Sequence, residues 1–259
     1  MSMRRAALAV LAVAVLAGAV ALALTRGGGS SDSTPTPARG PSVRAPKALS
    51  PAQAARAALL RRGPVRARVL RRVQLRARPG GRVVRTLGRR TGYGSRQVLA
   101  VVARRQGWLG VLSPSLPNSR AGWIPAAAAK LLYEPYALEV DLSARRILVR
   151  RKGRAVRRVK VAIGRTGTAT PIGRFAVTDA LRMSSNGAGP YGCCALALTG
   201  RQPDIPQNWG GGDRLAIHGT KDASVLGKRV SLGCVRASNR DMRWLMKRVR
   251  AGTIVRIRA

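Results

Sequence analysis

One histidine and one cysteine near the carboxyl end of this chain have the residue types that nucleophilic catalysis needs. His218 is the only histidine in 259 residues, and Cys234 follows it sixteen positions later. A thiol is only slightly ionised at neutral pH, and a neighbouring imidazole can take its proton and make the sulfur a far stronger nucleophile. The loop between the two residues can fold back and bring them together. We therefore predict a Cys–His pair, although either residue alone would more often be structural.

The residues around Cys234 suit a nucleophile held on a tight turn. Gly233 precedes it and permits backbone conformations that other residues avoid. Backbone N–H groups at such a turn are well placed to stabilise a developing oxyanion. A helix is expected to begin a few residues later, and the positive end of its dipole would favour the thiolate.

A β-rich segment that starts at Tyr136 must position this pair. Apolar alternation predicts strands at residues 137–141, 146–151, 157–163, 173–178, 195–199, 214–218 and 253–257. Hairpin turns are expected at Ser143-Ala144 and at Lys152-Gly153, between the first three strands.

One helix is clearly signalled near the end of the chain. Ser238 and Asp241 form a Ser-x-x-Asp start, and apolar residues then recur at helical spacing up to Val249. Gly252 stands where a C-cap glycine is expected. The sequence thus predicts a β-rich domain with a single clear helix.

Residues 65–132 predict a separate, small all-β barrel. Short apolar runs at 73–77, 83–87, 98–103, 108–112 and 122–124 are separated by turn signals rich in glycine and proline. The order of these runs resembles bacterial SH3-like modules, in which "WLGV" and a later "GWI" recur. A barrel this small needs bulky core residues, so we expect Trp108 and Trp123 to be buried.

The amino-terminal part indicates export. An uncharged stretch from residue 6 to 24 lies between Arg4-Arg5 and Arg26, which predicts that residues 1–26 are a signal peptide or a membrane anchor. The length favours an anchor, whereas small residues at 21–23 would allow cleavage. Residues 27–64 are rich in Gly, Ser, Thr and Pro and predict a flexible linker, with a short Ala-rich helix at 51–62.

The charge of the chain is strongly positive. Forty-nine Lys and Arg against nine Asp and Glu give a formal charge of +40, which favours polyanionic neighbours such as nucleic acid, anionic lipid or wall polymer. The arginines are spread along the whole chain and aromatic residues make up only 3%, so nucleic-acid binding is not expected. A general bias toward arginine would explain the same charge without any partner.

Three cysteines are too few for a disulfide framework. Cys193 and Cys194 are interpreted first as small buried strand residues, with a vicinal disulfide as the alternative, and neither is assigned a function. Cys234 remains the odd cysteine.

The order of these motifs resembles the L,D-transpeptidase (YkuD-like) family. Its signature is a His-Gly on a strand, about fifteen residues, then Ser-x-Gly-Cys-(Ile/Val)-Arg and a helix. The segments "EVDLSARRILVRRKG", "AIGRTGTATPIGRFAV", "YGCCALAL" and "GTIVRI" continue the likeness, so residues 133–259 are predicted to be the catalytic domain. The fold class implied is mainly β, a YkuD-like domain with one clear helix after an SH3-like barrel.

Two positions depart from the family pattern. Many members have His where this chain has Leu232, and many have Asn in place of the arginine that ends this signature, which is Arg236 here. Leucine cannot accept a proton, so His218 must be the sole base.

The resemblance implies an enzyme that acts on peptidoglycan stem peptides. Cys234 would attack the carbonyl that joins a diamino acid to D-Ala and release D-Ala, with His218 as base. Backbone N–H groups of Gly233 and Cys234 would form the oxyanion hole, and Arg236 would meet a substrate carboxylate. Neither a metal nor a cofactor is expected.

Three further residues receive roles from the same resemblance. Ser231 orients either the turn or the imidazole. Gly219 and Thr220 flank the base, and Thr220 either holds it through a hydrogen bond or is simply a turn residue. The same site could let water resolve the acyl-enzyme, as in an L,D-carboxypeptidase, or the chain could be a wall-binding protein without activity. The location implied is the cell wall or the extracytoplasmic face of the membrane, with membrane contact through residues 1–26 if they stay attached.

Overall fold

The structure is a computed structural model that describes residues 50–51, 54, 58, 63–184, 189–206 and 212–259. These residues lie in one compact unit, Ala48–Ala259. The predicted signal or anchor, most of the predicted linker and nearly all of the predicted helix at 51–62 lie outside the described residues. Within the described ranges, no helix is long and apolar enough to cross a membrane.

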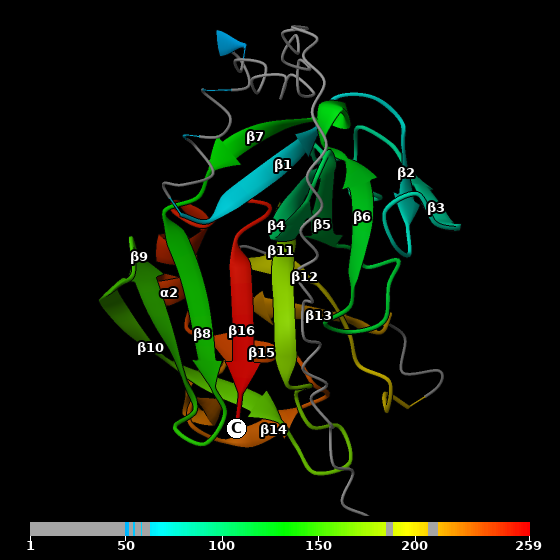
Figure 1. Cartoon of the computed structure of the whole chain (residues 1–259). Coiled ribbons are helices and arrows are strands. Elements are labelled where there is room, and N and C mark those ends of the chain that lie inside the picture. The colour runs from blue at the N-terminus through cyan, green and yellow to red at the C-terminus, as the bar shows by residue number, and fades with distance from the viewer. Residues whose placement is uncertain (1–49, 52–53, 55–57, 59–62, 185–188, 207–211) are drawn as a thin grey trace, which may run out of the picture. The chain divides into compact units, whose positions relative to one another are not determined.

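The first part of the described chain forms a seven-stranded sheet (Figure 1). In hydrogen-bonded order its strands are β3 (Val83–Leu87), β2 (Val73–Arg76), β6 (Ala121–Pro125), β5 (Trp108–Leu112), β4 (Val98–Arg105), β1 (Val65–Val69) and β7 (Ala129–Tyr133), with a short 3-10 turn η1 (Ala126–Ala128) before β7. Alternate residues of β1 point inward, as the apolar pattern of a half-buried strand requires. Ala67, Leu75, Val111 and Ile124 are among the fully buried residues of its core.

The five strands predicted in this part are present, and β1 and β7 are additional. The prediction that Trp108 and Trp123 fill the core is wrong, because both side chains are only half-buried. Trp123 lies on the outer face, with the Arg105 guanidinium 5.4 Å from its ring centroid. Ile124, its neighbour in β6, points inward instead. The likeness of this sheet to SH3-like modules stays a prediction.

The second sheet has nine strands. In hydrogen-bonded order they are β14 (Arg229–Ser231), β10 (Arg154–Gly164), β15 (Val235–Ala237), β13 (Arg214–His218), β12 (Cys194–Arg201), β11 (Gly173–Arg182), β16 (Ile254–Arg258), β8 (Tyr136–Asp141) and β9 (Arg146–Arg151). A 3-10 turn, η2 (Ala223–Val225), precedes β14. The described chain is therefore mainly β, as predicted.

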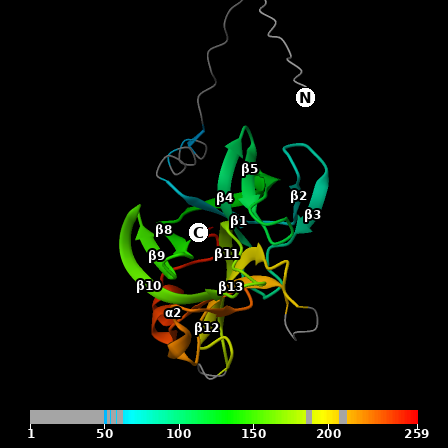
Figure 2. The same cartoon turned by 90° about the horizontal axis from the view of Figure 1, so that it is seen from below.

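Strand β10 closes this sheet on itself. It is long and strongly curved (Figure 2). Its first part pairs with β9, and its last four residues pair with β15 and β14. Leu138, Ile147, Val161 and Ile217 come from different strands and are all fully buried in the common core. The segment that precedes Cys234 is thereby fixed to a rigid sheet.

Local chemistry explains the two hairpins at the start of this sheet. Lys152 and Gly153 both have positive φ, 50° and 82°, which is the conformation of a two-residue type I′ turn. The other turn is stabilised by the Asp141 carboxylate, which accepts hydrogen bonds from the Ser143 hydroxyl and the Ala144 N–H. Both turns lie where the sequence predicted them.

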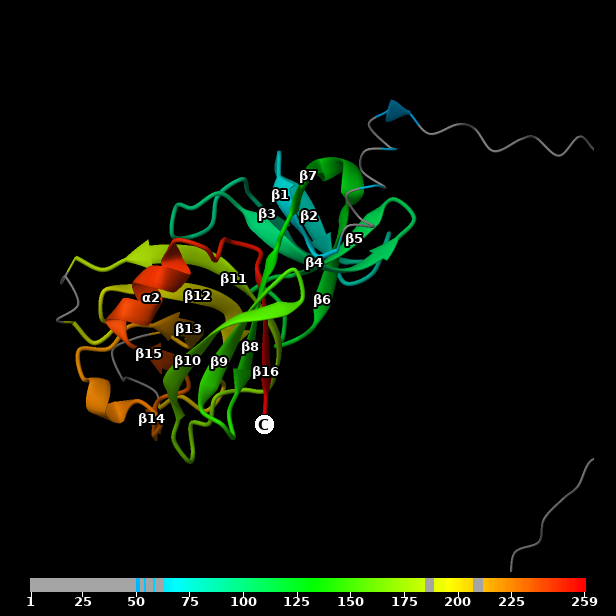
Figure 3. The ribbon, with the colours of Figure 1, turned by 90° about the vertical axis from the view of Figure 1, so that its left-hand side faces the viewer.

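The predicted helix is α2 (Asn239–Met246), which packs against β12 (Figure 3). Ser238 is its N-cap, accepting from the Asp241 N–H at 3.0 Å and donating to the Asp241 carboxylate at 2.8 Å. The helix ends sooner than predicted, with Lys247 as C-cap. Gly252 instead has φ 88° in the turn before β16, where its N–H donates to the carbonyl of Val177.

The two sheets pack against each other within this unit. Ala100 and Leu112 of the first sheet share a buried cluster with Ala176 of β11. Arg66 forms an ion pair with Glu134 and also donates to the carbonyl of Ala251. The first sheet is therefore held firmly beside the strands that carry the predicted chemistry.

Candidate active site

His218 is the last residue of β13 and is buried. Leu215 and Ile217 point into the core, so Arg214, Ala216 and His218 share the opposite face of the strand. The His218 Nδ1 lies 2.7 Å from the carbonyl oxygen of Gly219. A carbonyl can only accept, so Nδ1 carries the hydrogen and Nε2 is left as the proton acceptor.

Cys234 is half-buried at the end of a turn between β14 and β15. Ser231 holds this turn, because its hydroxyl donates to the carbonyl of Cys234 at 2.5 Å and accepts from the Gly233 N–H at 3.2 Å. Gly233 has φ 114°, a region that residues with a side chain avoid. A Cβ added there would also lie 2.6 Å from the Gln202 Nε2. Glycine is thus required for both conformation and space.

The pairing of β13 with β15 brings the base and the thiol to one face. The two strands are parallel, and His218 is the register partner of Arg236. Cys234 stands directly before β15, two residues ahead of Arg236, so the alternation of that strand, if continued, puts its side chain on the side of His218. The sulfur also lies 3.9 Å from the carbonyl oxygen of Arg214, on the same strand as His218.

Burial keeps both members of the pair neutral at rest. Desolvation lowers the pKa of His218 to about 4, opposed in part by its bond to Gly219 and assisted by the positive charge of Arg236. Desolvation likewise raises the pKa of the Cys234 thiol, although the Arg236 charge favours the thiolate. The proton would therefore move from sulfur to imidazole as the sulfur attacks, rather than beforehand.

Tyr191 completes the site and had no predicted role. Its ring meets His218 edge-on, with centroids 5.0 Å apart. Burial raises the pKa of the Tyr191 hydroxyl, and a negative charge on Cys234 would raise it further. Tyr191 therefore contacts His218 and also interacts electrostatically with Cys234. The signal in the sequence is weak: a Tyr-Gly pair in a turn, directly before the two adjacent cysteines.

The other predicted site residues differ in what they contact. Thr220 does not hold the base through its hydroxyl, which donates to the Asp222 carbonyl and accepts from the Asp222 N–H. Gly219 lies against Gly192 and the Asn239 amide, where a Cβ would clash. Arg236 is near the pair, and its Nε is buried without a hydrogen-bond partner in the described part of the structure.

Residues 135–257 match the model of the YkuD family, the L,D-transpeptidase catalytic domain. The segment that this model covers is called the YkuD domain below. The "Putative L,D-transpeptidase YkuD" of Bacillus licheniformis is 35% identical over 123 residues, which are 48% of this chain and 66% of that protein. Its namesake from Bacillus subtilis is 32% identical with the same coverage. The chain thus spans slightly less than two thirds of the length of these relatives.

Among solved structures, L,D-transpeptidase 3 from Mycobacterium tuberculosis, in complex with a faropenem-derived adduct, is similar with a TM-score of 0.41 and 18% identity. The match covers 54% of this chain and 73% of that one.

In the YkuD domain the start of the helix contacts Cys193, and Cys193 is disulfide-bonded to Cys194. Strand β15 separates α2 from Cys234 along the chain. The side-chain oxygen of Asn239, the first residue of α2, instead accepts a hydrogen bond of 2.8 Å from the Cys193 N–H. The expectation that the helix start favours the Cys234 thiolate is therefore not supported by these contacts. Cys193 and Cys194 form a vicinal disulfide, the alternative that the sequence left open.

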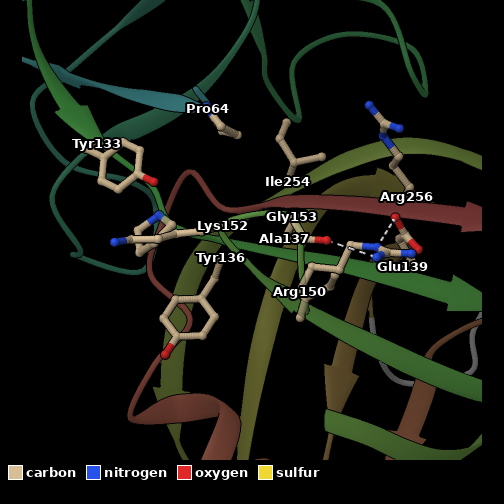
Figure 4. Close-up of a pocket in the computed structure, with 12 residues that line it drawn as sticks. Pro64, Tyr133, Tyr136, Ala137, Glu139, Arg150, Lys152, Gly153, Ile254 and Arg256 are labelled. Carbon is tan, nitrogen blue, oxygen red and sulfur yellow. Dashed lines mark hydrogen bonds and ion pairs between the residues drawn. The ribbon is translucent and has the colours of Figure 1, made fainter. Parts of the chain in front are cut away.

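One cavity lies where the end of the first sheet meets the YkuD domain, away from the Cys–His pair. It measures about 780 Å³ and is lined by Tyr133, Tyr136, Lys152 and the Glu139–Arg150 ion pair, among others (Figure 4). Neither Cys234 nor His218 lines it. Among the described residues, no group of three or more His, Cys, Asp or Glu could hold a metal ion.

Proposed function

We propose that this chain is a peptidoglycan L,D-transpeptidase that works through a thioester on Cys234. The observation that supports this most is the position of Cys234 directly before β15, the strand that pairs in parallel with the end of β13 at His218. A neutral imidazole with its Nε2 unprotonated and a free, half-buried thiol are the two groups that general-base activation of a nucleophile requires.

The first half-reaction makes the acyl-enzyme. The Cys234 thiol gives its proton to His218 Nε2 while the sulfur attacks the carbonyl between the diamino acid and D-Ala of a donor stem. The tetrahedral intermediate then collapses, and His218 returns the proton to the departing amine. D-Ala leaves with that proton, and the donor remains as a thioester.

The second half-reaction forms the cross-link. The side-chain amine of an acceptor stem attacks the thioester carbonyl and gives a proton to His218. The C–S bond breaks, the sulfur recovers the proton, and a new amide joins the two stems. No second imidazole stands at position 232, so His218 performs all four proton transfers.

The turn at Cys234 supplies the groups that stabilise charge. The Cys234 N–H and the Gly233 N–H are the proposed oxyanion donors, and the latter must exchange its 3.2 Å bond to Ser231 for the oxyanion. Arg236 has a buried Nε without a partner among the described residues, which fits the proposed contact with a carboxylate of the substrate. Ser231 keeps the turn in shape.

The natural setting of this reaction is the cell wall. Export by residues 1–26 and attraction of the positively charged chain to anionic wall polymers are part of the proposal. The proposed reaction uses neither a metal nor a cofactor.

The test is to incubate the purified chain with tetrapeptide muropeptides and analyse the products by mass spectrometry. We expect cross-linked dimers and free D-Ala with the wild type and neither with Cys234→Ala. Trimmed monomers without dimers would identify an L,D-carboxypeptidase. No product from a folded wild-type chain would favour a wall-binding protein.

A further inference from the structure

A second cavity lies between the first sheet and the YkuD domain, beside the candidate active site. It measures about 510 Å³. One side is formed by the loop that follows β3, with Arg90, Thr91 and Tyr93, and the other by Asp179, Arg201 and Arg214 of the YkuD domain. The loop is fastened across the cavity, because the Thr91 hydroxyl donates to the buried Asp179 carboxylate at 2.5 Å.

Arg214 joins this cavity to the thiol. Its side chain lines the cavity, and its carbonyl oxygen is 3.9 Å from the sulfur of Cys234. Along β13, successive residues on the same face are about 7 Å apart, and Arg214, Ala216 and His218 follow each other on that face. The cavity therefore reaches the start of β13 at Arg214, the residue whose carbonyl lies next to the Cys234 sulfur.

The lining of the cavity is positively charged. Arg85, Arg90, Arg201 and Arg214 line it together with a single acid, Asp179. Arg201 and Arg214 are engaged with the protein, through Asp213 and the carbonyl of Leu198 respectively. Arg85 is exposed at the cavity, and a guanidinium there can bind a carboxylate through two parallel hydrogen bonds.

Tyr93 is the aromatic residue among those that line the cavity, and it is 54% exposed. A negative charge on its phenol would raise the pKa of both Tyr191 and Arg214. An exposed aromatic ring in this place can pack against the backbone of a bound peptide.

We propose that this cavity binds a carboxylate-bearing part of the stem peptide next to the bond that Cys234 attacks, with Arg85 and Tyr93 as the residues that select it. The identity of the ligand as a stem peptide rests on the proposed function. The volume suits a small peptide segment rather than the long track that a charged polymer would need. The first sheet is thus a part of the substrate site and contributes specificity.

Binding can be measured without turnover in the full chain carrying Cys234→Ala. The probes are a stem tetrapeptide with free carboxylates and the same peptide with every carboxylate amidated, compared by calorimetry. We expect the free acid to bind about tenfold more tightly, the size of one charged hydrogen-bonded pair. Equal affinity for the two peptides, or binding of neither, would overturn the inference.

Variants then assign the selectivity. Arg85→Gln and Tyr93→Ala, each added to Cys234→Ala, should weaken binding of the free acid about tenfold, and Arg85→Gln should also remove the preference over the amide. Arg82→Gln is the matched control, since Arg82 is an exposed arginine of the same region that does not line the cavity. An equal loss with Arg82→Gln would mean that only general charge attracts the peptide, and the inference would be wrong.

Two further outcomes separate the ligand from the reaction. Tighter, Arg85-dependent binding of poly(glycerol phosphate) would assign the cavity to a wall polymer instead of a peptide. Cross-linking by the wild type together with equal binding of the two peptides would leave the proposed function standing and refute this inference. Selective binding of the free acid without any turnover by the wild type would support this inference and refute the proposed function.

Discussion

The rings of Tyr191 and His218 meet edge-on, with their centroids 5.0 Å apart and an angle of 71° between their planes. Tyr191 comes from the turn before β12 and His218 from the end of β13, so two neighbouring segments enclose the imidazole. Burial is the main reason why the pKa of His218 falls to about 4. Tyr191 is therefore expected to set the pH range in which the base is neutral.

Removing this ring should shift the acid limb of the pH–rate profile for acylation to higher pH. In Tyr191→Ala, water reaches His218 and its pKa rises from about 4 toward the ordinary value near 6.5. Because only the neutral imidazole can accept the thiol proton, acylation by a β-lactam at pH 5 should slow markedly in the variant and little at pH 8. Tyr191→Phe keeps the ring and should keep the wild-type limb. An acid limb at the same pH in all three chains would show that Tyr191 does not control the base.

Folding stability should carry the signature of a buried neutral histidine. Between pH 6.5 and about 4 the unfolded chain binds a proton at His218 and the folded chain does not, so this residue makes stability fall as the pH is lowered. From pH 7 to pH 5 the contribution is on the order of 2 kcal/mol. Urea unfolding of the wild type and of His218→Gln at both pH values measures it as a double difference. A double difference near zero would contradict the pKa shift.

Gly233 should tolerate no side chain. Its φ of 114° and the close approach of Gln202 predict that Gly233→Ala destabilises the fold by roughly 1–3 kcal/mol and moves the nucleophile. Gly212→Ala is the matched control, because a Cβ there would meet no atom within 4 Å, and its effect should stay within about 0.5 kcal/mol. Denaturant midpoints of the two variants decide the matter, and equal midpoints would argue against a strained turn at Gly233.

The hydroxyls of Ser231 and Thr220 should have different effects. Ser231→Ala leaves the Cys234 carbonyl and the Gly233 N–H without their partner, so we expect a loss of about 1–3 kcal/mol and acylation that is at least about tenfold slower. Thr220→Val breaks only contacts with Asp222 and should leave the acid limb unchanged. A shifted limb in Thr220→Val would restore its predicted role beside the base.

The strands that carry the chemistry were predictable where they are long and alternate regularly. The predicted strand 214–218 agrees with β13, and the Ser238–Asp241 pair marked the start of α2, because each signal is local in the chain. Strands β14 and β15 were not predicted. Each has three residues, too few for a periodic pattern, yet β15 starts directly after Cys234 and pairs with the end of β13.

Other features depend on contacts between segments distant in sequence. Tyr191 packs on His218 only because β12 and β13 pair. Two adjacent cysteines look the same in the sequence whether they form a vicinal disulfide, as here, or are unpaired core residues. Trp123 points outward because its neighbour Ile124 points inward, and the number of aromatic residues in the sequence does not show which of the two faces the core. Sequence thus supplied the candidate residues, and the sheet pairing determined their neighbours.

Intact-mass analysis after incubation with a carbapenem tests the assignment of the nucleophile most directly. The β-lactam ring opens on the sulfur, so the wild-type chain should gain the full mass of one carbapenem. The Cys234→Ala chain should gain none, since Cys193 and Cys194 are paired with each other. A folded wild-type chain without an adduct, or an adduct of equal yield on Cys234→Ala, would contradict the role of Cys234.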